Sequence, residues 1–173
     1  MATWEGKAGT YWISNEAIAF FDVLLKYSKI SYFLEIGSFD GVVISVLAEK
    51  HPHAMYYALD AFQKGHGTDS GNLNSFIQNT KGLDNIVLLK GPSCAILPVL
   101  RDRMFDIIFV DGDHAYESVK SDVEMCYRLL KPGGVMAMHD YFNIEDTKRA
   151  IDEFAQTNHI TLSGLADIAW FRK

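Results

Sequence analysis

Positive charge is in short supply in this sequence. It has 16 Lys and Arg residues against 22 Asp and Glu residues, which gives a formal net charge of -6. Proteins that hold nucleic acid through its phosphates present a face on which Lys and Arg residues cluster. An excess of acidic residues is not typical of such proteins. The composition therefore predicts a small or neutral partner and no nucleic acid.

Cysteine and long apolar runs are also scarce. The two cysteines, Cys94 and Cys126, are far apart and form no CxxC pair, which disfavours both a disulfide framework and a zinc site. No apolar run approaches the roughly 20 residues of a membrane span, and the N-terminal residues lack the basic and apolar regions of a signal peptide. We therefore expect a cytoplasmic protein with no membrane partner.

Apolar residues are plentiful by comparison. They make up 49% of the 173 residues, which is enough for one compact core and too little for two. We expect a single domain over residues 1–173, in which residues 1–30 form a lid and a first helix. Ser14 is a candidate N-cap for that helix, because Ala17 and Phe21 follow it at helical spacing.

Strand-like apolar runs alternate with stretches of helical period along the chain. This pattern predicts an α/β fold: a Rossmann-like, doubly wound, seven-stranded and mostly parallel sheet, with a C-terminal antiparallel hairpin and helices on both faces. The expected strands cover residues 32–37, 54–61, 85–91, 105–113, 135–140, 160–165 and 168–173. We also expect "KPGG" (131–134) to end the helix before the fifth strand, Asn143 to cap the helix after it, and His51 to lie in a surface loop beside Pro52.

Polar residues follow four of the expected parallel strands. In open parallel sheets, ligands sit beyond the carboxyl ends of the strands, where the winding reverses. The residues at these ends are Glu35, Gly37, Ser38, Asp40 and Gly41 after strand one, Asp60 after strand two, Asp111, Asp113 and His114 after strand four, and His139 and Asp140 after strand five. Their shared position predicts a ligand site at this edge, in which Asp113 only forms a turn.

The glycines after the first strand have the spacing E-x-G-x-x-x-G. This is not the dinucleotide fingerprint G-x-G-x-x-G, because Phe39 and Val42 stand where that motif requires glycine. Gly37 would let the backbone approach a ligand, and Gly41 would permit a tight turn into the next helix. Asp60, roughly twenty residues further on, suits a ribose diol, which NAD and adenosyl ligands have in common.

The sequence resembles the class I S-adenosylmethionine-dependent methyltransferases, in particular the small branch of sugar, macrolide and cephalosporin-pathway O-methyltransferases. The resemblance covers nearly the whole chain and is carried by "LEIGSFDG", "ALDAF", "LLKGPS" and "FDIIFVDGDHAYESVKSDVEMCYRLLKPGGVMAMHDY". It implies S-adenosylmethionine as cofactor. The implied cofactor contacts are Glu35, Gly37, Ser38, Asp40 and Gly41 around the methionine part, Asp60 at the ribose, Ala61, Phe62 and Ser93 near the adenine, and Asp111 and His114.

Several members of this branch bind a divalent cation after strands four and five. The matching positions here are Asp111 and Asp140, with His139 where an acidic ligand is often found. Mg²⁺ prefers oxygen ligands, whereas an imidazole in the set shifts the preference toward Mn²⁺, iron or zinc, or stays free as a base. Two alternatives therefore remain, with and without a cation, and the expected catalytic residues are His139 as ligand or base, His114 as base or as packing over the methionine part, and Asp111.

The function expected from this resemblance is methyl transfer to a hydroxyl of a small molecule or sugar. Two other hypotheses remain open: the protein is an NAD- or nucleotide-sugar-dependent oxidoreductase, or it is a non-catalytic adenosyl-binding module. Acceptor specificity is expected in the loop 63–72 and in the first dozen residues, since loops carry most substrate contacts. Either the acceptor is small, or the second subunit of a homodimer completes its pocket.

Overall fold

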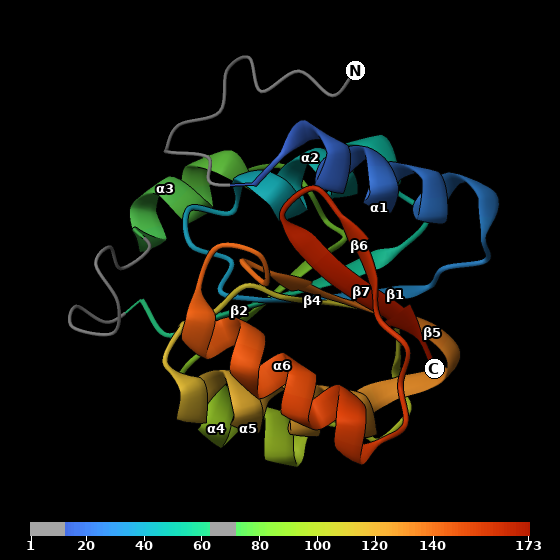
Figure 1. Ribbon diagram of the computed structural model, residues 1–173. Coiled ribbons are helices and arrows are strands. Elements are labelled where there is room, and N and C mark those ends of the chain that lie inside the picture. Colours follow the sequence, from blue (N-terminus) through green and yellow to red (C-terminus); the bar gives the residue numbers. More distant parts are fainter. Residues whose placement is uncertain (1–12, 63–71) are drawn as a thin grey trace.

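The computed structural model describes residues 13–62 and 72–173, and Figure 1 shows them as a sheet between two layers of helices. The elements in chain order are α1 (Asn15–Tyr27), β1 (Tyr32–Ile36), α2 (Val42–Lys50), β2 (Met55–Asp60), α3 (Leu73–Asn79), β3 (Ile86–Lys90), α4 (Ser93–Ile96) with a following 3₁₀ turn (Leu97–Val99), β4 (Phe105–Val110), α5 (Tyr116–Leu129), β5 (Leu130–His139), α6 (Glu145–Thr157), β6 (Ser163–Leu165) and β7 (Ile168–Arg172). The expected lid over the first dozen residues lies outside the described residues, as does nearly all of the expected acceptor loop.

The seven strands form one sheet in the order β3-β2-β1-β4-β5-β7-β6. Strands β1 to β5 pair in parallel, while β7 runs antiparallel to both β5 and β6. This confirms the predicted doubly wound sheet with its C-terminal hairpin. The winding reverses between β1 and β4, so the carboxyl ends of these two neighbours are where a ligand is expected.

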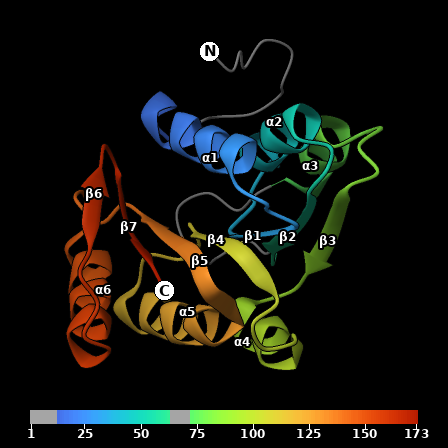
Figure 2. The same cartoon turned by 90° about the vertical axis from the view of Figure 1, so that its right-hand side faces the viewer.

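Helices cover both faces of the sheet, as Figures 1 and 2 show: α1, α2 and α3 on one side, and α4, α5 and α6 on the other. Side chains alternate between the two layers along each strand, because successive residues of a strand point to opposite faces. In β1, Phe33 packs under α1 and α2, and its neighbour Leu34 packs toward α5 and α6. In β4, Ile107 likewise packs in the layer of α1 and α2, and Ile108 in the layer of α5 and α6.

The first helix begins where the sequence predicts. Ser14 is its N-cap, and the Ser14 Oγ accepts a hydrogen bond from the backbone N–H of Ala17 at 3.1 Å. Ala17 and Phe21 are fully buried on the face that lies against the sheet. A local signal, a capping residue followed by apolar residues at helical spacing, was sufficient here because both its parts lie within a few residues.

The prediction for residues 131–134 is only partly right. Helix α5 does end just before this segment, but β5 already begins at Leu130, and "KPGG" lies within the strand. Leu130 pairs with Phe105, whereas regular pairing resumes only at Val135 opposite Ile107, so the segment forms an irregular bulge. Its backbone is held by two hydrogen bonds to Lys173 at the end of the chain, a long-range contact that local sequence does not reveal.

Two further predictions were wrong. Asn143 does not cap α6: the N-cap is Ile144, and the Asn143 amide donates instead to the Asp140 carboxylate at 3.2 Å. His51 was expected in a surface loop next to Pro52 but is buried, and its Nε2 lies 2.7 Å from an oxygen of Asp22. The partner of Asn143 is local, three residues before it in the chain, whereas the partner of His51 comes from α1, so only the place of His51 depends on a distant contact.

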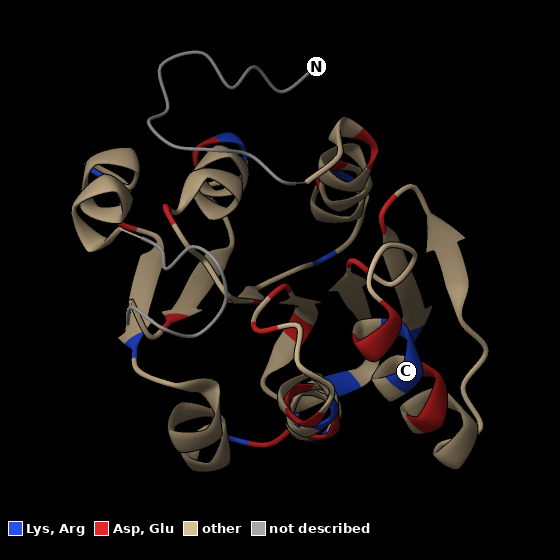
Figure 3. Ribbon diagram, turned by 60° about the vertical axis from the view of Figure 1, so that its left-hand side comes forward, with Lys and Arg blue, Asp and Glu red and all other residues tan. Residues whose placement is uncertain are grey.

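The charged residues show no single basic stripe in the part of the chain that the structure describes. Figure 3 has Lys and Arg on several separate elements, and Asp and Glu both on helices and on loops at strand ends. Across residues 13–62 and 72–173, no helix combines the length and the apolar character that a membrane span needs.

Candidate functional site

The site is built where β1 and β4 end side by side. Gly37, with φ of 82°, directly follows β1, and a Cβ added to it would lie 1.9 Å from the backbone oxygen of Asp111, which follows β4. The Asp111 N–H in turn donates to the carbonyl oxygen of Ile36 at 2.9 Å. Gly37 is therefore required by the close packing of these two strand ends, a reason different from the ligand approach that the sequence indicated.

A buried carboxyl group lies beneath this turn. Glu35 and Ser38 are 2% and 5% exposed, and neither Glu35 Oε2 nor the Ser38 hydroxyl has a hydrogen-bond partner among the described residues. Burial raises the pKa of Glu35 to about 8; the contact with the Ser38 side chain opposes the rise, and the nearby charge of Asp111 adds to it. Unpaired buried polar atoms are rare in folded proteins, so this pair is suited to a polar ligand that supplies partners.

Asp60 is held rigidly at the end of β2. Its two carboxylate oxygens accept backbone N–H groups from Phe39 and Phe62, each at 2.7 Å. Both phenylalanines have positive φ angles, 47° and 49°, a conformation that non-glycine residues adopt rarely and mostly where structure or function demands it. Burial raises the pKa of Asp60, and these two hydrogen bonds oppose the rise.

The other residues expected at the cofactor fall into two groups. Asp40 and Gly41 build the β1–α2 turn: the Asp40 carboxylate accepts the N–H of Asn72, and Gly41 is the N-cap of α2 with φ of 71°, as its predicted turn role requires. A Cβ on Gly41 would lie 2.6 Å from the ring of Phe76. Ser93 is the first residue of α4. Burial raises the pKa of Asp122 to about 6, and a hydrogen bond from Ser93 opposes this rise. Ala61 follows Asp60 and is half-buried.

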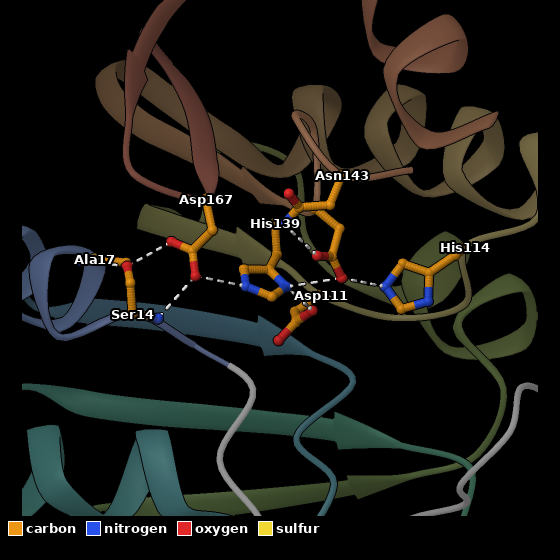
Figure 4. A network of polar contacts seen from close by, with 8 residues as sticks. Ser14, Ala17, Asp111, His114, His139, Asn143 and Asp167 are labelled. Carbon is orange, nitrogen blue, oxygen red and sulfur yellow. Dashed lines mark hydrogen bonds and ion pairs between the residues drawn. The ribbon is translucent and has the colours of Figure 1, made fainter. Parts of the chain in front are cut away.

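Four side chains converge beyond the ends of β4 and β5. Asp111, His114, His139 and Asp140 each direct one possible ligand atom to a region in which these atoms lie within 4.8 Å of one another (Figure 4). Asp140 has a φ of 55°, the strained left-handed conformation, which turns the chain sharply after β5. The structure therefore brings together all the residues for which the sequence predicted metal binding or catalysis.

The contacts inside this cluster are short but poorly aligned. The Nδ1 of His139 lies 2.9 Å from an oxygen of Asp111 and 3.1 Å from one of Asp140, and the Nε2 of His114 lies 2.9 Å from the same Asp140 oxygen. Neither nitrogen makes a hydrogen bond of acceptable geometry within the described residues, although both atoms are buried. Nitrogen and oxygen atoms that face a common centre are suited to a shared cation.

The electrostatics of the cluster favour one positive charge between the carboxylates. Burial lowers the pKa of His139, but the carboxylates of Asp111 and Asp140 outweigh it and raise this pKa to about 11. Burial also raises the pKa of Asp111, while the two histidines hold the pKa of Asp140 below its usual range. Without a metal ion, the proton on His139 supplies this positive charge; a divalent cation would compete with that proton for Nδ1.

Two residues that the sequence analysis missed stand behind His139. Asp167, in the turn between β6 and β7, lies with one oxygen 3.0 Å from the Nε2 of His139, and Ser14 donates two hydrogen bonds to the Asp167 carboxylate. These residues carry no motif. The sequence shows only an acidic residue in the hairpin turn and an N-cap for α1. Because the two are 153 residues apart, nothing in the sequence indicates that they are in contact.

Comparison with known proteins agrees with this architecture. A family model described as "Methyltransferase domain" matches residues 34–141, which is more than half of the chain. The chain belongs to this methyltransferase family. The matched range runs from β1 to the residue after Asp140, so the strand ends described above lie within the family's defining region. The resemblance to class I methyltransferases is thereby confirmed, and the oxidoreductase alternative loses its support.

Several solved structures with the same fold are named as O-methyltransferases. A protein named as a caffeoyl-CoA O-methyltransferase from Staphylococcus aureus superposes with a TM-score of 0.76 at 14% identity, covering 94% of this chain and 85% of that one. An O-methyltransferase from Bacillus cereus in complex with SAH gives 0.73 at 17% identity (95% and 84%). TomG from Streptomyces achromogenes in complex with SAM, an O-methyltransferase involved in tomaymycin synthesis, gives 0.72 at 16% identity (92% and 80%). At these identities the likeness establishes the fold.

One curated relative is similar in sequence. The uncharacterized protein R132 of Acanthamoeba polyphaga mimivirus is 29% identical over 114 residues, which cover 63% of this chain and 51% of the relative. The chain thus matches about half the length of that protein.

Proposed function

We propose that this protein is an S-adenosylmethionine-dependent O-methyltransferase that acts on a hydroxyl group of a small molecule or sugar with the help of a divalent cation. The observation that carries the proposal is the convergence of two carboxylates and two imidazoles, from Asp111, His114, His139 and Asp140, next to the turn after β1. A fold that only bound an adenosyl group would have no need to gather four such groups at one edge.

The cofactor would lie across the ends of β1 and β2. In this proposal the unpaired polar atoms of Glu35 and Ser38 face its methionine part, and the fixed carboxylate of Asp60 accepts the ribose hydroxyls. Gly37, Asp40 and Gly41 shape the turn that approaches the cofactor. Ala61, Phe62 and Ser93 lie on the side assigned to the adenine, and S-adenosylmethionine would supply the methyl group.

The cation would be held by Asp111, His139 and Asp140. Their donor set of two carboxylates and one imidazole suits Mn²⁺ and accommodates Mg²⁺. When bound, the cation would polarise the acceptor hydroxyl and lower its pKa. This is needed because an alcohol does not ionise at neutral pH and is a poor nucleophile in its protonated form.

His114 is the residue we assign as general base. Its side chain is 41% exposed, whereas that of His139 is only 2% exposed, so His114 can pass a proton on to solvent. Its Nε2 faces the cluster and lies 2.9 Å from Asp140. With the Asp140 carboxylate taken up by the cation of this proposal, Nε2 would be free to accept the hydroxyl proton, and the nearby negative charge would stabilise the imidazolium that forms. Removing this proton would leave the oxygen nucleophilic at the moment of transfer.

The proposal is tested by calorimetric titration with S-adenosylmethionine and, separately, with NAD, each with and without Mn²⁺. We expect micromolar binding of the methyl donor, weakened at least tenfold by Asp60→Ala, and no binding of NAD. Release of S-adenosylhomocysteine is then followed with a panel of phenols, catechols and sugars. Loss of turnover in His114→Ala with unchanged donor affinity would support the assigned base.

Other results would require a different conclusion. Binding of NAD in place of S-adenosylmethionine would overturn the proposal. Donor binding without turnover on any hydroxylated acceptor would favour the non-catalytic adenosyl-binding module. The homodimer also stays a prediction, and a monomeric mass in solution at full activity would refute it.

A further inference from the structure

Asp167 connects the cation cluster to the beginning of helix α1. One of its carboxylate oxygens lies 3.0 Å from the Nε2 of His139 and accepts the backbone N–H of Ser14 at 2.7 Å. Its other oxygen accepts the hydroxyl of Ser14 at 2.5 Å. Figure 4 shows this chain of contacts running from α1 through the β6–β7 turn to His139, on the side opposite Asp111.

The chemistry of Asp167 decides which nitrogen of His139 carries a proton. An ionised carboxylate only accepts hydrogen bonds, and Asp167 accepts two from Ser14, one from its backbone N–H and one from its hydroxyl. The His139 Nε2 must therefore be the donor in this contact. The lone pair of the neutral ring is then on Nδ1, the atom that faces Asp111 and Asp140.

We propose that Asp167, clamped by Ser14, is a positioning residue that fixes the tautomer and ring orientation of His139 and thereby sets the affinity of the site for a divalent cation. This rests on the cation site of the proposed function and adds two residues to it. Carboxylates that orient a ligating histidine in this way commonly change metal affinity by about 10- to 100-fold when they are removed.

Ser14 also couples the site to the helix. Its hydroxyl gives its one proton to Asp167 and accepts the N–H of Ala17 at 3.1 Å, so a single oxygen serves both the carboxylate and the first turn of α1. The negative charge of Asp167 also lies close to the N-terminus of a 13-residue helix, where it is favourable. The position of His139 therefore depends on a helix that begins 125 residues earlier in the chain, counting from Ser14 to His139.

The decisive substitution is Asp167→Asn. The asparagine keeps the size of the side chain, but its amide can turn an N–H toward Nε2, which would place the His139 proton on Nδ1 and point it at the cation site. Mn²⁺ binding is measured by the electron paramagnetic resonance signal of the free ion. We expect about 10- to 100-fold weaker binding in Asp167→Asn and Asp167→Ala, a smaller loss in Ser14→Ala, and recovery in Ser14→Thr, which restores the hydroxyl.

A second readout reports on the histidine itself. With ¹⁵N-labelled histidine and saturating Mg²⁺, the wild-type protein should give a protected Nε2–H resonance for His139 with an unprotonated Nδ1. In Asp167→Asn the proton should appear on Nδ1. A purely structural role for Asp167 would change stability without moving this proton.

The matched control is Asp22→Asn. Asp22 contacts the Nε2 of another buried histidine, His51, at 2.7 Å, so this variant breaks the same kind of pair away from the cluster. It should leave Mn²⁺ affinity unchanged. Equal weakening in this control, or unchanged affinity in all variants at Asp167 and Ser14, would overturn the inference while leaving the cation site intact. Failure of the wild-type protein to bind Mn²⁺ would overturn the cation site and this inference together.

Discussion

The substitution Gly37→Ala tests how tightly the two central strand ends are packed. The added Cβ would lie 1.9 Å from the backbone oxygen of Asp111 and 2.8 Å from the Cα of Gly112. The Asp111 carbonyl would have to move by more than about 1 Å to reach a normal contact distance. This shift would disturb the hydrogen bond that the Asp111 N–H donates to the Ile36 carbonyl. Because the obstacle is backbone, no change of side-chain rotamer can relieve it.

The expected cost has two parts. The left-handed conformation of residue 37 costs alanine about 1–2 kcal/mol, and forcing extra volume into a packed site costs about 1–3 kcal/mol more. Gly82→Ala separates these parts. Gly82 has nearly the same φ, 81° against 82°, but an added Cβ there meets no atom within 4 Å, so this variant should lose only the conformational part.

Guanidinium unfolding at constant pH, followed by circular dichroism, measures both variants. We expect Gly37→Ala to lose about 2–5 kcal/mol of unfolding free energy and Gly82→Ala about 1–2 kcal/mol, with similar m-values. Equal losses in the two proteins would refute the reasoning, since they would mean that the contact between Gly37 and Asp111 is not tight in solution.

Two further predictions concern buried polar groups. Burial raises the pKa of Glu35 from 4.5 to about 8, so between these pH values the folded protein retains a proton that the unfolded chain releases. The free energy of unfolding should therefore fall by up to about 4 kcal/mol as the pH rises through this range. In urea titrations at several pH values, Glu35→Gln should remove this pH dependence. Identical slopes would contradict the assignment. The hydroxyl of fully buried Tyr56 donates to the Leu47 carbonyl at 3.0 Å, so Tyr56→Phe should cost about 1–2 kcal/mol in thermal unfolding, and an unchanged midpoint would argue against this bond.

The elements that the sequence predicted well are those with strong local signals. The cap at Ser14 and the buried face of α1, with Ala17 and Phe21, appear where helical spacing placed them. The elements predicted poorly depend on distant partners. "KPGG" lies in β5 because Lys173 holds its backbone, and His51 is buried because Asp22 of another helix contacts it. Local propensity contains no information about either partner.

The candidate site also has contacts that the sequence predicts and contacts that it does not. The sequence by itself determined that Asp60, Asp111, His139 and Asp140 would meet at one edge of the sheet, because parallel strands with polar residues at their carboxyl ends can bring them nowhere else. Only the tertiary structure decided that Asp167 supports His139. That contact joins the terminal hairpin to the first helix across 153 residues, from Ser14 to Asp167. It depends on how the antiparallel pair β6–β7 docks against β5, and periodicity along the chain does not encode such docking.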